Sequence, residues 1–152
     1  MNNVDYLAIQ EHFKNTKTTD TYFRDKFRDN NSYEISGYHP PGQDFGRSKA
    51  GMAQLSRKSY SVKKDRLKTS GYRLQAQILN MPSGKVLWLN TYMPTDLHRL
   101  TEYDDSILRE VLLEVETLLT SCTYSDVIWA GDLNWDMSRT KYFSRTMADF
   151  MS

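Results

Sequence analysis

Several features that would direct an interpretation are scarce in this chain. It has one cysteine, Cys122, so no disulfide can form within it and a reducing compartment is favoured. No apolar run approaches the roughly 18 residues that a membrane span requires. The first residues carry neither the basic stretch nor the long apolar segment of a secretion signal. We therefore expect an intracellular protein, nuclear or cytoplasmic, that is neither secreted nor embedded in a membrane.

An excess of charge of one sign is also lacking. Twenty Lys and Arg residues face 19 Asp and Glu residues, giving a net charge of +1. This balance excludes a general electrostatic attraction to nucleic acid or to a membrane, so any nucleic-acid contact must come from a local patch. The chain has no repeats, low-complexity tracts or linkers, and its 152 residues fit a single domain with one core.

Strand-like and helical patterns follow one another along the chain. The long helix is predicted from an apolar stripe at helical spacing between Ile107 and Leu119. Residues 72–79 alternate apolar side chains with Arg73, Gln75 and Gln77, which predicts a strand with one face in water. The expected strands are 4–10, 33–38, 51–57, 72–79, 86–91 and 127–130, and the expected helices are 18–30, 101–120 and a segment from residue 142 onward.

Polar side chains directly follow three of these strands. Glu11 follows the first strand and Tyr92 follows the run Val86–Thr91. The apolar run 127–130, which predicts a buried strand, ends in Gly131-Asp132-Leu133-Asn134. In layered α/β proteins, ligands gather outside the carboxyl ends of the strands. We therefore expect these side chains to converge on one polar site.

The chemistry of these side chains suits phosphodiester hydrolysis, which needs neutralised phosphate charge and an activated water. Glu11 is a candidate ligand for Mg²⁺, a cation that binds through one or two carboxylates. Asp132 could orient or deprotonate the water, while Asn134 and Tyr92 could donate hydrogen bonds to phosphate oxygens. Taken singly, each residue also has an ordinary explanation: a solvated glutamate, a turn, and a tyrosine used in packing.

The order of these motifs resembles that of the endonuclease/exonuclease/phosphatase superfamily. The resemblance rests on four segments: Leu7–Glu11 (LAIQE), Gly46–Ala53 (GRSKAGMA), Asn90–Pro94 (NTYMP) and Gly131–Asn134 (GDLN). Three further pieces resemble the apurinic-endonuclease-like domain of LINE-type (non-LTR) retrotransposons: Gln10–His12, Pro94–Asp96 and Asn134–Arg139.

That resemblance implies an α/β (α+β) fold, in which two packed mixed β-sheets are flanked by helices as a four-layer sandwich. It also implies Mg²⁺, with Mn²⁺ as a substitute, and DNA as the partner. Carried over by position, Glu11 is the metal ligand, Tyr92 a phosphate contact and Asp132 the residue that positions the water, with Asn134 beside it. A reverse transcriptase on a larger polypeptide is a further implied partner.

The chain departs from the family pattern at both ends. The family begins with an earlier strand that carries an asparagine near the metal, and it ends with an aspartate and a Ser-Asp-His type motif. We expect residues 1–152 to form one domain that lacks these elements and is impaired or inactive by itself. The histidines His12, His39 and His98 are expected to be ordinary surface residues.

Further residues are candidates for phosphate or DNA contacts. Arg57 and Lys58 begin the one basic cluster, for which a solvated hairpin at a sheet edge is the simpler interpretation. Glycine near Arg47 and Lys49 lets backbone approach a phosphate, although a flexible loop explains that segment equally well. Trp135 could stack on a base. Asp136 could assist the metal or a hydrogen-bond network, while a turn is the plainer explanation.

The sequence therefore supports three hypotheses about function. The first is a Mg²⁺-dependent DNA endonuclease of the retrotransposon type that nicks one strand. The second is a remnant or nucleic-acid-binding module of the same fold without turnover. The third is a phosphoesterase that acts on a lipid or a small-molecule phosphate.

Overall fold

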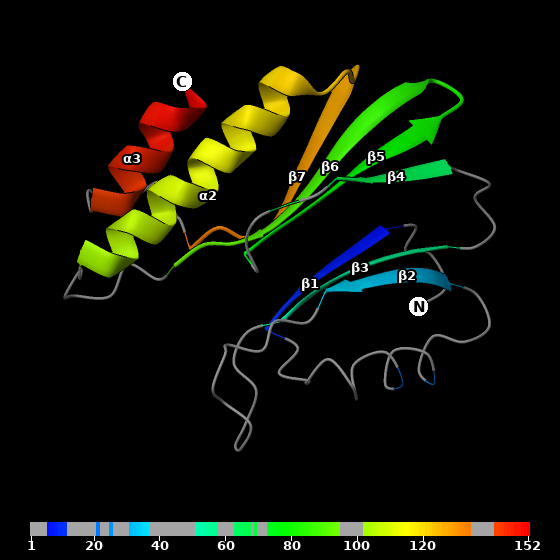
Figure 1. Ribbon diagram of the computed structural model, residues 1–152, viewed down its shortest axis with the longest axis horizontal. Helices are drawn as coiled ribbons and strands as arrows, with labels where there is room; N and C mark the ends of the chain where they lie inside the picture. The colour runs from blue at the N-terminus through cyan, green and yellow to red at the C-terminus, as the bar shows by residue number, and fades with distance from the viewer. Residues whose placement is uncertain are drawn as a thin grey trace.

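Over the residues that it describes, the computed structural model has two β-sheets and two helices, of 20 and 10 residues, arranged in layers (Figure 1). It describes residues 6–11, 21, 25, 31–36, 51–57, 63–67, 69, 73–94, 102–134 and 142–152. The helices α2 and α3 lie on one side of the larger sheet, and the smaller sheet lies on its other side. The expected α/β class with two packed sheets and helices is confirmed.

The smaller sheet has three strands in the order β1-β3-β2, and all of its pairings are antiparallel. Its central strand pairs Ala53 with Ile9 on one side and with Ile35 on the other. These strands agree with the expected segments to within a few residues. The elements are β1 (Tyr6–Gln10), β2 (Asn31–Ser36) and β3 (Met52–Arg57).

The larger sheet has four strands in the order β4-β5-β6-β7. Its first three strands are antiparallel neighbours, whereas β6 and β7 are parallel and are connected through α2. The strand β4 was not among the expected strands, but it lies at one edge of this sheet within the basic cluster, for which a hairpin at a sheet edge was the simpler interpretation. The elements are β4 (Lys63–Leu67), β5 (Leu74–Met81), β6 (Gly84–Tyr92) and β7 (Asp126–Asp132).

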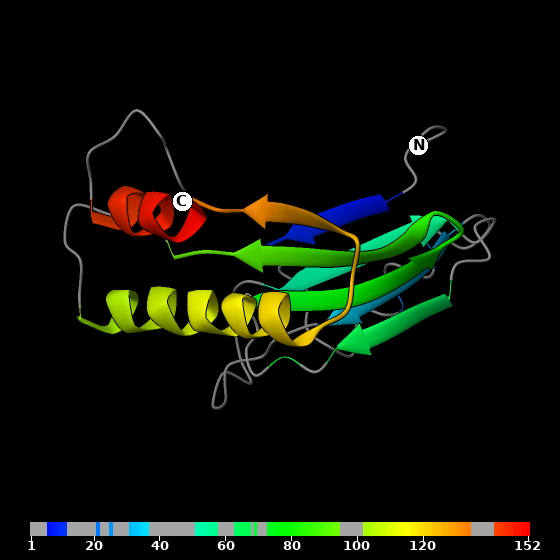
Figure 2. The same cartoon turned by 90° about the horizontal axis from the view of Figure 1, so that it is seen from above.

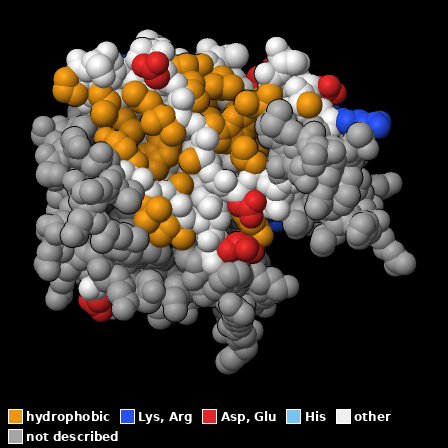
Figure 3. Space-filling model, turned by 180° about the vertical axis from the view of Figure 1, so that it is seen from behind, with side chains coloured by type: hydrophobic (Ala, Val, Ile, Leu, Met, Phe, Trp, Pro, Cys, Tyr) orange, Lys and Arg blue, Asp and Glu red, His pale blue; other side chains and the backbone are white. Residues whose placement is uncertain are grey.

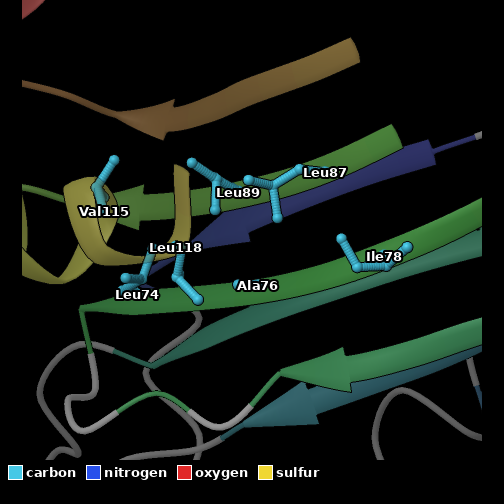
Figure 4. Close-up of a cluster of buried hydrophobic side chains, with 7 residues drawn as sticks. All are labelled: Leu74, Ala76, Ile78, Leu87, Leu89, Val115 and Leu118. Atoms are coloured by element: carbon cyan, nitrogen blue, oxygen red, sulfur yellow. The ribbon is translucent and has the colours of Figure 1, made fainter. Parts of the chain in front are cut away.

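The helix α2 (Glu102–Ser121) confirms the prediction made from its apolar stripe. Its Val115 and Leu118 pack against apolar side chains of β5 and β6, and Figure 4 shows these residues between helix and sheet. The helix α3 (Tyr142–Met151) packs beside it through Met147, which belongs to a second apolar cluster with Leu108 and Leu112. No helix in the described part of the chain is long and apolar enough to cross a membrane.

The other face of the larger sheet corrects one prediction. Gln75 and Gln77 on β5 were expected to face water, but they are 8% and 2% exposed. The smaller sheet covers this face, where Trp88 of β6 meets Tyr6 of β1 edge to face at a centroid distance of 5.3 Å. An alternating pattern looks the same whether the polar face meets water or a second sheet.

The position of β7 corrects a second prediction. The run 127–130 was expected to be a buried strand, yet Val127 and Ile128 are 39% and 46% exposed. Among the described strands, β7 pairs only with β6 and forms the edge of the sheet. Figure 3, which shows the molecule from behind, displays hydrophobic side chains gathered on this surface.

Candidate functional site

Three strands end at the same side of the molecule. The arrowheads of β1, β6 and β7 point the same way in Figure 2. The parallel register pairs Tyr92 at the end of β6 with Asp132 at the end of β7. Glu11 directly follows β1 in the other sheet. The arrangement brings the ends of both sheets together.

The contact that closes the site joins the two sheets. The hydroxyl of Tyr92 donates a hydrogen bond to Oε1 of Glu11 over 2.6 Å. Such a length is typical of a hydroxyl bound to an ionised carboxylate. The carboxylate of Glu11 is exposed, so it is available to a ligand arriving from solvent. Two residues that are 81 positions apart in sequence therefore form one polar pair.

Both Glu11 and Asn134 adopt left-handed backbone conformations, with φ of 51° and 48°. Asparagine tolerates this region, whereas glutamate is rarely found there. Each such residue outside glycine costs on the order of 1–3 kcal/mol, and such strain clusters at functional sites. The strand β1 ends at Gln10, and the left-handed residue Glu11 follows it at the sheet end.

The segment after β7 is tied to the segment after β6 by two hydrogen bonds, and a third lies within the end of β7. The amide of Met93 donates to the carbonyl of Asp132 over 2.9 Å, and Nδ2 of Asn134 donates to the carbonyl of Met93 over 2.8 Å. The amide of Asn134 also donates to Oδ1 of Asp132 over 3.1 Å. Asn134 therefore holds the two segments together, and its Nδ2 retains a second hydrogen for another acceptor.

Close approach of β7 to β6 depends on Gly131. A Cβ at this position would lie 2.0 Å from the carbonyl oxygen of Thr91, and φ is +133°. Only glycine avoids both the collision and the strained backbone. Gly131 therefore lets β7 carry Asp132 to a position beside Tyr92.

The phenol of Tyr92 is held in its protonated form. Burial, together with the hydrogen bond and the negative charge of Glu11, raises the pKa of Tyr92 to about 12. The carboxylate of Asp132 acts in the same direction, while Arg73 opposes it. Tyr92 is consequently a hydrogen-bond donor at neutral pH, which excludes it as a general base.

Arg73 is a neighbour of this site that sequence reasoning did not assign to it. Its guanidinium carbon lies 4.9 Å from the centroid of the Tyr92 ring, and Nη1 donates to the Tyr92 carbonyl over 3.0 Å. In sequence, Arg73 is one polar residue in an alternating strand, so it carries no local signal. It places a positive charge against the Tyr92 ring.

The donor set of the site is suited to a hydrated Mg²⁺ ion. Among the described residues, no group of three or more His, Cys, Asp or Glu side chains lies close enough together to hold a metal ion. Mg²⁺ usually keeps several waters and needs only one or two protein carboxylates. Glu11 meets this requirement, because Tyr92 engages Oε1 and a single metal bond needs only Oε2. Asp132 supplies a second exposed carboxylate at the same sheet end.

The structure thus brings together Glu11, Tyr92, Asp132 and Asn134. Arg57, another predicted contact residue, is the last residue of β3. The three histidines lie outside the described residues. So do the remaining predicted contact residues, which are Arg47, Lys49, Lys58, Trp135 and Asp136.

Several solved structures share the fold of this chain at low sequence identity. Beta toxin from Staphylococcus aureus matches with a TM-score of 0.63 and 14% identity, over 99% of this chain and 59% of that one. Sphingomyelinase C from Streptomyces griseocarneus matches with a TM-score of 0.63 and 15% identity, over 98% and 57%. An endonuclease/exonuclease/phosphatase family protein from Leptotrichia buccalis matches with a TM-score of 0.56 and 16% identity, over 96% and 62%.

Comparisons by sequence found no match. No protein-family description matches the chain, and no curated protein matches it. The chain spans 57–62% of the length of the solved structures named above. Their likeness shows that this chain has a fold of the endonuclease/exonuclease/phosphatase type.

Proposed function

We propose that this chain is part of a Mg²⁺-dependent phosphodiesterase, most specifically a DNA endonuclease of the retrotransposon type that nicks one strand. The single observation that supports it is the 2.6 Å contact between Tyr92 and Glu11, with Asp132 paired beside Tyr92 in the parallel register. A carboxylate, a protonated phenol and a second carboxylate at one sheet end meet the needs of phosphate chemistry.

Each side chain has a separate task in this proposal. A bound Mg²⁺ neutralises charge on the phosphate. Glu11 binds the cation, and Asp132 orients the attacking water and accepts its proton. The Tyr92 hydroxyl has a single proton, which it now donates to Glu11, so a hydrogen bond to the phosphate requires that this proton turn toward the substrate. Asn134 can use its second amide hydrogen at the phosphate.

The test measures nicking of supercoiled plasmid by the 152-residue chain with Mg²⁺, with EDTA as the metal-free control. The decisive pair of variants is Asp132→Asn and Asp126→Asn, because both aspartates are exposed and lie at opposite ends of β7. Loss of an acid or base group lowers the rate by about 10²–10⁴-fold. We expect that loss for Asp132→Asn and for removal of metal, and no change for Asp126→Asn.

Other outcomes favour the two alternative functions. Binding of Mg²⁺ and DNA without nicking would favour the remnant or nucleic-acid-binding module. The similarity to sphingomyelinase C motivates a parallel assay with sphingomyelin vesicles. Hydrolysis there without plasmid nicking would replace DNA by a lipid phosphodiester. Equal nicking by the Asp132 and Asp126 variants would refute the assignment of this site.

A further inference from the structure

Amide side chains form a hydrogen-bonded chain between the two sheets. Nε2 of Gln10 on β1 donates to Oδ1 of Asn90 on β6. Nδ2 of Asn90 then donates to Oε1 of Gln75 over 3.0 Å and to the carbonyl of Ala53 over 3.3 Å. Gln75 in turn donates to the carbonyl of Met52 over 3.3 Å. This row of hydrogen-bonded amides, called the amide chain below, links strands β1, β6, β5 and β3.

Asn90 is the central member, and it is 0% exposed. Burying an amide is unfavourable unless its hydrogen bonds are made. Apolar contacts tolerate sliding of one sheet over the other, whereas these hydrogen bonds are directional and break when the sheets move. The amide chain therefore specifies one relative placement of β1 and β6.

The amide chain adjoins the candidate site directly. Gln10 immediately precedes Glu11, and Asn90 lies two positions before Tyr92. Residues two apart on a strand face the same side, so Asn90 and Tyr92 both face the smaller sheet. The pair Gln10–Asn90 and the pair Glu11–Tyr92 are thus successive links between the same two strands.

Glu11 has particular need of such an anchor. Its left-handed backbone, with φ of 51°, is not what a glutamate adopts by preference. Something outside the residue must hold it, because a strained conformation persists only where the surroundings determine it. The bond from Gln10 to Asn90 fixes the residue just before this turn.

We infer that Asn90 is a positioning residue of the site: held between Gln10 and Gln75, it sets β1 against β6 so that the Glu11 carboxylate meets the Tyr92 hydroxyl. The effect on this contact is independent of the reaction, whereas any effect on hydrolysis rests on the proposed function.

The first test reads the Tyr92–Glu11 contact without any assay of activity. The ¹³Cζ resonance of Tyr92 is assigned by its loss in Tyr92→Phe, and it is measured at neutral pH in the 152-residue chain. Glu11→Gln gives the position of the resonance without the carboxylate. We expect Asn90→Leu to move the resonance to the Glu11→Gln position. A milder variant, Gln10→Met, leaves Asn90 with Gln75 and is expected to move it part of the way.

Two controls separate positioning from general loss of stability. Gln54 on β3 is a buried amide whose Nε2 has no hydrogen-bond partner among the described residues. The variant Gln54→Leu therefore removes a buried amide that is not a member of the hydrogen-bonded amide chain. Leu89 precedes Asn90 on β6 and packs in the cluster against α2, so Leu89→Ala weakens the opposite face. Both controls are expected to leave the Tyr92 resonance unchanged.

Each result decides the inference. A wild-type resonance in folded Asn90→Leu and Gln10→Met would overturn it, and so would an equal shift in Leu89→Ala. If Asn90→Leu does not fold, Gln10→Met and the controls still decide. In the nicking assay, misplacement of a group by about 1 Å costs about 10²-fold in rate, which we expect for Asn90→Leu and not for Gln54→Leu. An inactive wild type with the expected NMR shifts would favour the module without turnover over the proposed nuclease and leave this inference intact.

Discussion

The two ends of the parallel pair β6–β7 are built differently. At the beginning, Ser125 bonds the carbonyl of Lys85 through its amide and its hydroxyl, at 2.8 and 2.9 Å. The next residues of β7, Val127 and Ile128, are substantially exposed. At the far end, the strands are joined by the bonds of Asp132 and Asn134 to Met93. The start of the strand pair is thus held by one serine at a single carbonyl, whereas at the far end Met93 both donates and accepts a hydrogen bond.

The far end is also reinforced from both faces. Toward the helices, Nε1 of Trp129 donates to Oγ1 of Thr91 over 2.8 Å, and the Trp129 ring meets Phe150 at 5.8 Å. Toward the smaller sheet, Tyr92 bonds Glu11. Contacts made by side chains are therefore concentrated at the end of the strand pair where the candidate site lies. Variants at matched positions of the two ends test whether the ends differ in stability.

The largest effect is expected for Gly131→Ala, compared with Gly84→Ala. The added Cβ at 131 would meet the backbone of Thr91 at 2.0 Å, whereas at 84 it would meet only the hydroxyl of Ser125 at 2.6 Å. A backbone cannot rotate away, but a serine side chain can. We expect a loss above about 4 kcal/mol in the free energy of unfolding for Gly131→Ala. For Gly84→Ala we expect about 1–3 kcal/mol from its positive φ.

Urea unfolding followed by circular dichroism measures both losses. Equal destabilisation by the two variants would contradict the expectation that an added methyl group is harder to accommodate at position 131 than at position 84.

A smaller effect is expected at Asn134, where two causes can be separated. Asn134→Ala removes the hydrogen bond to Met93 and places alanine at φ near 48°, so we expect a loss of about 2 kcal/mol. Asn134→Gly removes the same bond but relaxes the backbone, so about 1 kcal/mol is expected. The measurement is again urea unfolding. Matching losses in the two variants would mean that the left-handed backbone carries no cost here.

The smallest effect is a pH dependence of stability due to Tyr92. Its pKa is raised to about 12 in the folded chain from an ordinary value of 10.0. The folded state therefore keeps the proton to higher pH than the unfolded state. This contribution is fully present below pH 10 and is lost as the pH rises from about 10 to about 12.

The measurement compares wild type with Tyr92→Phe from pH 8 upward. We expect the difference in their free energies of unfolding to be constant up to about pH 10 and to shrink above it. A difference that stays constant through pH 12 would show that burial and Glu11 do not raise the pKa of Tyr92.

Much of this arrangement is predictable from the sequence. The apolar stripe of α2 and the strand ends at Glu11, Tyr92 and Asp132 follow from local periodicity and turn residues. Which face of a strand meets which neighbour is a long-range property, and so Gln75 and Gln77 were wrongly expected to face water. The exposure of β7 was missed for the same reason. The left-handed backbone of Glu11 and the contact of Arg73 with Tyr92 have no signature in single residues.

The backbone at Glu11 has a consequence for protein engineering. A sequence redesigned to suit this backbone would place glycine or asparagine at position 11, because both accept a φ of 51° more readily than glutamate does. Such a redesign would gain local stability and erase the carboxylate that faces Tyr92. Glu11 is thus a position where optimisation for folding and retention of the site pull in opposite directions, and it should be held fixed in any stabilised version of this chain.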